Sequence, residues 1–121
     1  MALTTADFSP TILTYKMAAD TDADATAVVD VTGGAGKLYS IHIDNTAGAS
    51  VYAKFALTTS TITVGATPPD LMIKVPATSV KDITMPDGIP FTNLSFWCVN
   101  DEADNNAASP AQNVTIRIVA S

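Results

Sequence analysis

Apolar and polar residues alternate along several short stretches of this chain, and this alternation restricts the possible fold more than any other feature. Between positions 37 and 45 apolar side chains recur at every second residue, as Tyr39, Ile41 and Ile43. The segments Ser50–Leu57 and Asn113–Ala120 repeat the pattern. Successive side chains of an extended chain point to opposite faces, so a period of two predicts half-buried β-strands with one solvated face.

Proline residues end some of the alternating stretches. Pro76 follows a predicted strand at Leu71–Val75, which must stop there because proline has no backbone N–H to donate to a sheet. In the next stretch Val80 and Ile83 are out of phase by one residue. This spacing predicts a β-bulge near residues 81–82.

Short glycine-rich and polar segments predict the turns. The sequence "TGGAGK" at 32–37 must turn the chain, because glycine tolerates positive φ. The sequence "NTAGAS" at 45–50 lies between two alternating stretches and predicts a hairpin with a loop of four or five residues. "PDGIP" at 86–90 predicts a tight corner.

Three further apolar runs complete a set of about eight predicted strands: Thr11–Met17, Thr26–Val31 and Leu94–Asn100. The run at 94–100 is apolar on both faces. No segment carries an apolar stripe with the 3.6-residue period of a helix. Short strands separated by turn signals predict an all-β fold, an antiparallel β-sandwich that is either jelly-roll-like or immunoglobulin-like.

The length of 121 residues fits a single domain. We assign residues 11–121 to the sandwich and residues 1–10 to an N-terminal arm or edge segment, and we prefer an arm that orders on contact with a partner. The polar loop Asp101–Gln112 is predicted to be the most mobile excursion.

Charge and composition narrow the classes of partner. Only 15% of the residues are charged, and 12 acids against 6 bases give a net charge of −6. Nucleic-acid binders concentrate Lys and Arg, which are scattered singly here, so no nucleic-acid partner is expected. No run approaches the roughly 18 apolar residues of a membrane span, and the first residues lack a signal-peptide pattern. We therefore expect no membrane partner and synthesis in the cytosol.

A short acidic stretch resembles a calcium-binding loop because three carboxylates alternate along it: Asp20, Asp22 and Asp24. An EF-hand loop needs glycine at its sixth position and glutamate at its twelfth, where this chain has Ala25 and Val31. A solvated loop is the preferred interpretation, with adventitious or interface calcium as the alternative. The same two interpretations apply to a second acidic group, Asp101, Glu102 and Asp104. We predict no metal site and no cofactor.

The residues that most often perform catalysis are isolated in this sequence. His42 is the only histidine and lies on the polar side of its predicted strand, and no serine occupies a G-x-S-x-G turn. Cys98 is the only cysteine, which excludes an intrachain disulfide, and it has no basic neighbour to lower its pKa. We therefore predict no catalytic residue, a surface role for His42 and a core position for Cys98.

Aromatic residues are spread one or two per strand, as a core requires. Alternation implies that Trp97 faces outward if Phe96 faces inward, with Tyr52 as a possible neighbour. An outward tryptophan indicates an interface or a ligand patch. Core or intersubunit packing is preferred over carbohydrate binding.

The segment Gly36–Asn106 resembles the small β-structured virion proteins of tailed bacteriophages. The features that carry the resemblance are "GKLYSIHIDNT", "VYAKFA", "TPPDLMIKVPA" and "MPDGIPFTNLSFW", in the order strand, turn, strand, proline-bounded strand and glycine corner. Within that group the chain is most similar to capsid decoration or cement proteins. The resemblance covers more than half of the chain, although each motif also serves ordinary strand and turn chemistry.

The resemblance implies a non-enzymatic structural protein of the virion that sits on the capsid exterior. Such a protein binds the assembled head and stabilises contacts between subunits of the major capsid protein. It also implies self-association, often as a homotrimer. We predict that the contact residues are the N-terminal segment and two outward aromatics: Ala2, Leu3, Phe8, Pro10, Tyr52 and Trp97.

Three other classes of function stay open at this point. The first is a tail, fibre or baseplate β-domain that binds host-surface glycans. A secreted carbohydrate-binding or adhesion module would need an export route. An enzyme would need His42 within hydrogen-bond reach of a serine or a carboxylate inside a cleft.

Overall fold

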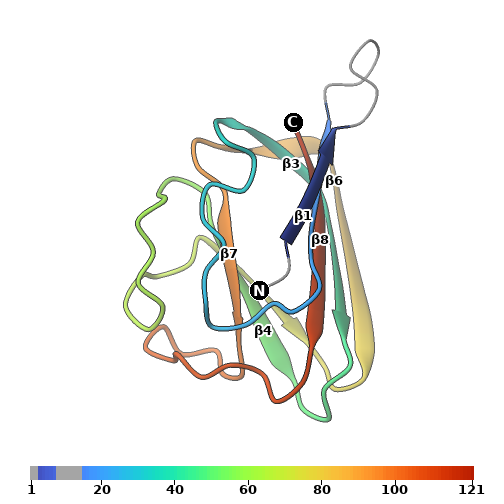
Figure 1. Ribbon diagram of the computed structural model, residues 1–121, viewed down its shortest axis with the longest axis vertical. Coiled ribbons are helices and arrows are strands. Elements are labelled where there is room, and N and C mark those ends of the chain that lie inside the picture. Colours follow the sequence, from blue (N-terminus) through green and yellow to red (C-terminus); the bar gives the residue numbers. More distant parts are fainter. Residues whose placement is uncertain (1–2, 8–14) are drawn as a thin grey trace.

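The computed structural model describes residues 3–7 and 15–121, and their regular structure consists entirely of β-strands (Figure 1). Eight strands are present: β1 Leu3–Asp7, β2 Lys16–Asp20, β3 Gly36–Asn45, β4 Val51–Ala56, β5 Leu71–Val75, β6 Ser79–Phe91, β7 Ser95–Val99 and β8 Val114–Ala120. All pair antiparallel within two sheets. The predicted all-β fold of about eight antiparallel strands is thereby confirmed.

The two sheets differ in width and pack face to face as a β-sandwich. The larger sheet has the strand order β1-β2-β8-β3-β6, and the smaller has the order β5-β4-β7. Strand β3 lies beside β8 and β6 in the larger sheet, so Ile41 has Ile118 on one side and Ile83 on the other. Alternate residues of each central strand therefore face the smaller sheet.

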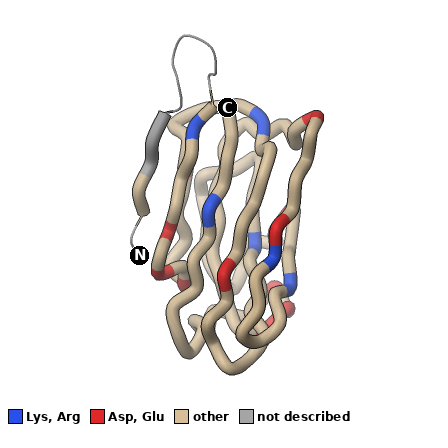
Figure 2. The backbone as a smooth tube through the Cα atoms, turned by 90° about the vertical axis from the view of Figure 1, so that its right-hand side faces the viewer, with Lys and Arg blue, Asp and Glu red and all other residues tan. Residues whose placement is uncertain are grey.

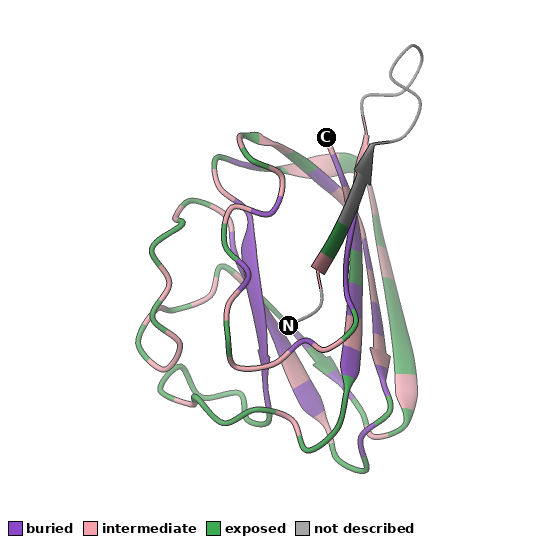
Figure 3. Cartoon of the chain, viewed as in Figure 1, coloured by how far each residue is buried: buried purple, intermediate pink, exposed green. Residues whose placement is uncertain are grey.

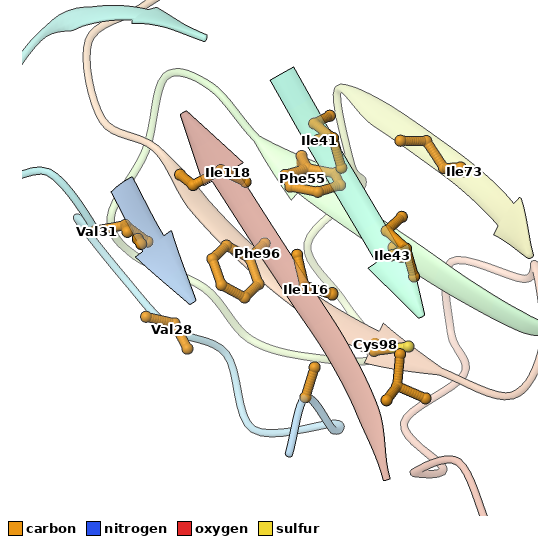
Figure 4. Close-up of a cluster of buried hydrophobic side chains, with 14 of the residues drawn as sticks. Val28, Val31, Ile41, Ile43, Phe55, Ile73, Phe96, Cys98, Ile116 and Ile118 are labelled. Atoms are coloured by element: carbon orange, nitrogen blue, oxygen red, sulfur yellow. The ribbon is translucent and has the colours of Figure 1, made fainter. Parts of the chain in front are cut away.

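The core fills the space between the sheets and consists mainly of aliphatic side chains with three phenylalanines, two of which are labelled in Figure 4. Phe55 and Phe96 belong to neighbouring strands of the smaller sheet, and their ring centroids are 5.8 Å apart. Ile116 and Ile118 of β8 face them from the larger sheet. Burial of one such side chain is worth about 1.5–3 kcal/mol, so this layer is the main stabilising element.

The hairpin predicted across residues 37–57 is wrong. Strand β3 belongs to the larger sheet and β4 to the smaller one, so the five residues between them cross from one sheet to the other. Asn45 holds this crossing although its side chain is only 1% exposed. Its amide nitrogen donates to the carbonyls of Ala49, Val75 and Pro76, and its amide oxygen accepts from the N–H of Ala47.

A β-bulge lies at a different place from the predicted one. Residues 79–84 of β6 pair continuously with β3, so no bulge occurs at 81–82. The register instead shifts between Leu38 and Ser40, which places Leu38 in the core and moves Tyr39 out of the phase expected for it. Opposite this shift Gly88 has a φ of +73°, and a Cβ there would meet the side chain of Tyr39 at 2.8 Å. The predicted corner "PDGIP" is thus an irregular part of the long strand β6.

Two further segments differ in the structure from what the sequence pattern predicts. The stretch Thr26–Val31 does not form a strand, and only Val28 makes an isolated bridge, with Phe96. Near the N-terminus, Leu3–Asp7 forms the edge strand β1 beside β2, so these residues are an edge segment of the sheet rather than a free arm. The glycine turn at 32–37 was predicted correctly, since Gly33 has a φ of +74° and its N–H donates to Asp30.

Candidate interface surfaces

Trp97 is buried, so its predicted role as an outward contact residue is wrong. It does lie on the opposite side of β7 from Phe96, but only 2% of it is exposed. Segments that join the strands cover it, and the partly buried residues around it include Ala27, Tyr52 and Ile62. Figure 3 shows β7 as buried along its whole length. Trp97 therefore anchors connecting segments of its own chain.

Lys54 lies beside Trp97 on the same covered face and is only 1% exposed. Its ammonium donates one hydrogen bond of 2.7 Å to the backbone carbonyl of Ala103, in the loop after β7. No carboxylate of the described residues lies within ion-pair distance of this ammonium. The lysine thus attaches the acidic loop to the sheet through a charge-assisted hydrogen bond.

Within the described residues no connecting segment covers the outer face of the larger sheet, and uncharged residues on it are mixed with charged ones such as Asp44, Asp82 and Arg117 (Figures 2 and 3). Cross-strand neighbours on it include Ser40 with Thr84, and Asp44 with Thr115. Each strand carries few charged residues, and Asp82 and Arg117 lie in one cross-strand row on either side of His42 (Figure 2). We call this surface the bare face.

His42 lies on the bare face opposite Asp82 of β6 and Arg117 of β8. Its Nδ1 is 2.5 Å from a carboxylate oxygen of Asp82, and the exposed fractions of the two side chains are 34% and 70%. A pair this exposed contributes little to stability. The pair lies on a flat sheet, and no serine is among the partners of His42.

Of the four predicted contact residues in the N-terminal segment, the structure describes only Leu3. Leu3 is half-buried and packs against the core. Ala2, Phe8 and Pro10 lie outside the described residues. Tyr52 is half-buried beside Trp97 under the covering segments, so it is part of the covered face.

The stretch with three alternating aspartates is a tight connection. Asp20 is buried on the inner side of β2, and its carboxylate accepts the N–H of Asp22. Asp24 accepts the N–H of Thr26 in the same way. Among the described residues no three His, Cys, Asp or Glu side chains gather as a metal site would require. Neither this stretch nor the loop at 101–104 therefore gathers three carboxylates at one point.

Cys98 is fully buried as a free thiol in the core, as predicted. Burial raises the pKa of this thiol to about 12, and the nearby carboxylates of Asp24 and Asp20 add to the increase against a backbone hydrogen bond at Tyr52. A thiol with so high a pKa is almost wholly protonated at neutral pH, and the thiolate is the reactive form.

Sequence reasoning missed the apolar residues that are most exposed. Val29, Met72 and Val80 are 47%, 42% and 53% exposed. Met72 belongs to β5 and Val80 to β6, and each of these strands is an edge of its sheet. The unexpected phase of Val80 was the available signal, because an apolar residue on the polar side of a strand indicates an exposed patch as readily as a bulge.

Comparisons with known proteins found no match: no family model, no curated protein and no solved structure is similar to this chain. No helix long and apolar enough to cross a membrane occurs in residues 3–7 and 15–121.

Proposed function

We propose that this protein is a non-enzymatic structural component of a tailed-bacteriophage particle, and that it decorates the capsid exterior. In this proposal it binds the assembled head and stabilises contacts between major-capsid subunits. The resemblance of Gly36–Asn106 supplies the identity of the particle, and this segment contains five strands, β3 to β7. The homotrimer that the resemblance implies belongs to the same proposal.

The observation that carries a docking function is the bare face. The five strands have five to thirteen residues each, and at about 4.8 Å spacing and about 3.3 Å per residue they give an area on the order of 600 Å². That is the lower end of one partner's share of a standard protein–protein interface. Its charged side chains, such as Asp82 and Arg117, are of both signs, so a partner surface must offer matching polar groups where they lie.

The chemistry of the reactive groups supports binding rather than catalysis. His42 is held by Asp82 on an exposed sheet, and the Cys98 thiol stays protonated inside the core. A protein that binds only the assembled shell shifts the assembly equilibrium toward that shell by mass action. Such a function needs a rigid surface and no reactive side chain.

Co-sedimentation with undecorated phage capsids tests the proposal. The wild-type protein should pellet with expanded capsids at saturating stoichiometry. Thr115→Arg, on the bare face beside Asp44, should abolish this binding. Ser60→Arg, an exposed position in the connection after β4, is the matched control and should bind normally. Absence of the wild-type protein from the capsid pellet would defeat the decoration proposal.

A second candidate is a tail, fibre or baseplate domain that binds host-surface glycans. One observation favours it: Tyr15 and Tyr39 are both partly exposed, and their ring centroids are 5.0 Å apart with an interplanar angle of 53°. Aromatic faces of this kind stack on sugar rings. A glycan array separates the two candidates, because specific glycan signals lost in Tyr39→Ala would favour the second and a blank array the first.

A further inference from the structure

Strand β6 contains a short stretch that does not pair with its neighbour. The register of β6 with β3 breaks off at Thr84 and resumes at Ile89. The residues between them, 85–88, have only Tyr39 opposite. In addition, β6 is the edge of the larger sheet, so no described strand of that sheet lies on its other side. Backbone without regular partners opens locally at a lower free energy than the paired parts of a strand.

This stretch holds the pair Asp87–Gly88, which is the only place in the sequence where glycine follows an aspartate or an asparagine. Asp87 is exposed. Gly88 has a φ of +73°, and a Cβ at this position would meet side-chain atoms of Lys37 and Tyr39 at 2.8 Å. Any other residue would therefore be strained and crowded there, so the fold requires glycine directly after an exposed aspartate.

A glycine after an aspartate leaves the side-chain carboxyl group open to attack by the next backbone nitrogen. Glycine has no Cβ, so no side chain shields the nitrogen of Gly88 from the carboxyl carbon of Asp87. The attack closes a five-membered ring and requires the backbone to rotate at Asp87. This rotation costs less free energy in backbone outside the paired register than within it. The reactive pair thus lies in the part of β6 that resists the reaction least.

We infer that Asp87 is a modification site, at which the folded protein converts aspartate to isoaspartate without an enzyme. The nitrogen of Gly88 bonds to the side-chain carboxyl carbon of Asp87, and one carboxyl oxygen leaves as water with its own proton and the amide proton. Water then adds to a carbonyl of the resulting succinimide ring. When the ring opens at the main-chain carbonyl, the chain runs through the Cβ of residue 87. Water is the only co-reactant, and no electrons are gained or lost.

The product changes the surface around Tyr39. Isoaspartate adds one methylene group to the backbone and moves the free carboxylate from the side chain to the main-chain carbon. Gly88 lies so close to Lys37 and Tyr39 that not even a Cβ fits between them, so a longer backbone must displace these side chains. The ring of Tyr39 packs 5.0 Å from that of Tyr15, and this contact changes with it.

Two other exposed aspartates serve as controls within the same molecule. Asp82 lies on the same strand, but it pairs in register with β3 and is followed by Ile83. Asp104 lies in a loop, but it is followed by Asn105. In both cases a side chain shields the next nitrogen, so both should remain aspartate while residue 87 converts. The inference does not depend on the proposed function.

Incubation of the folded protein at neutral pH tests the inference. Digestion with a protease that cleaves before aspartate but not before isoaspartate, followed by mass spectrometry, locates the product. Isoaspartate should accumulate at position 87 without a change in mass, and before any is found at Asp82 or Asp104. D87E should accumulate none at this position, because a glutamate side chain would have to close a larger ring. Circular dichroism checks that D87E is folded.

A synthetic peptide with the sequence of residues 82–93 measures the rate of conversion without the fold. The rate at position 87 in the folded protein should lie within about tenfold of the peptide rate, because local opening is sufficient. If the reaction required global unfolding, the rate would fall by the ratio of folded to unfolded protein, about a thousandfold or more. A larger decrease than the expected one, or equal conversion at Asp82 or Asp104, would overturn the inference.

Discussion

The outer faces of the two sheets differ in how far connecting segments of the chain cover them. Connecting segments cover the part of the smaller sheet's outer face formed by β4 and β7, so that Trp97 and Lys54 are 2% and 1% exposed, whereas Met72 on the edge strand β5 is 42% exposed. The outer face of the larger sheet is left uncovered, and Arg117 at its centre is exposed. Both faces come from strands with the same two-residue alternation. The alternation along a strand therefore does not show whether its outer face is covered by segments of the same chain or is left free to bind a partner.

The lengths of the connections account for the difference. The connections after β4 and β7 each exceed a dozen residues, and both join strands of the smaller sheet to the next strand. Residues between β2 and β3 also reach the smaller sheet, where Val28 and Phe96 exchange two backbone hydrogen bonds. In the part of the chain that the structure describes, the residues beyond what a turn needs are thus laid over the smaller sheet.

The strongest test of the comparison removes Trp97. Trp97→Ala should lower the free energy of unfolding by about 3–5 kcal/mol, because it leaves a large cavity under the covering segments. Arg117→Ala on the bare face should change it by less than about 0.5 kcal/mol. Urea unfolding measures both. Similar effects for the two variants would show that the smaller sheet is not covered.

The pH dependence of the free energy of unfolding tests the burial of Cys98 in the core between the two sheets. The folded-state pKa of about 12 lies above the ordinary value of 9.0, so the unfolded chain loses this proton first as pH rises. The stabilising contribution is complete below pH 9.0 and is lost toward pH 12. The slope is about 1.4 kcal/mol per pH unit. Urea melts between pH 8 and 11 should show a steeper decline for the wild type than for Cys98→Ala, and equal slopes would contradict the burial of the thiol.

Lys54 tests how the covered face holds its loop. Lys54→Met removes a buried charge together with its single hydrogen bond, so global stability should change by no more than about 1 kcal/mol in either direction. The amides of Asn100 and Asn106 should nevertheless exchange hydrogen faster, because the loop loses its attachment. Lys37→Met, at an exposed lysine on β3 of the other sheet, is the control. Unchanged exchange in Lys54→Met would mean that the hydrogen bond to Ala103 does not hold the loop.

The smallest effect is expected on the bare face itself. A double-mutant cycle with His42→Asn and Asp82→Asn should give a coupling energy below about 1 kcal/mol, since both side chains are partly exposed and screened by solvent. Thermal melts at pH 5.5 and 8 measure it. A coupling of several kcal/mol would mean that this surface is shielded from water, against the distinction drawn between the two faces.

Much of the secondary structure could be predicted from residue pattern, and pairing between strands could not. The alternation at Tyr39, Ile41 and Ile43 located β3, but strands joined by five residues alternate in the same way whether they pair or belong to opposing sheets. The side-chain hydrogen bonds of Asn45 hold the crossing that puts β3 and β4 in opposing sheets, and they reach residues up to 31 positions away. The alternation of residues within a short segment does not predict such long-range contacts.

The candidate surfaces were less predictable than the strands. Alternation placed Trp97 opposite Phe96 correctly, but its burial depends on segments whose course is set by packing. The exposed position of Val80 on the edge strand β6 was missed because its phase was interpreted as a sign of a bulge. Edges become visible only once the strand order is known, since the same strand is protected at the centre of a sheet and accessible at its margin.

The amino-acid sequence by itself determined that the chain forms strands and which side chains share one face of each strand. Those properties depend on the local geometry of an extended backbone. It also placed the thiol in the core and a turn at Gly33. The tertiary structure alone decided which strands are edges, where the bulge lies and which outer face is covered. These depend on contacts between residues far apart in the chain, whose free energies are not expressed in any short segment.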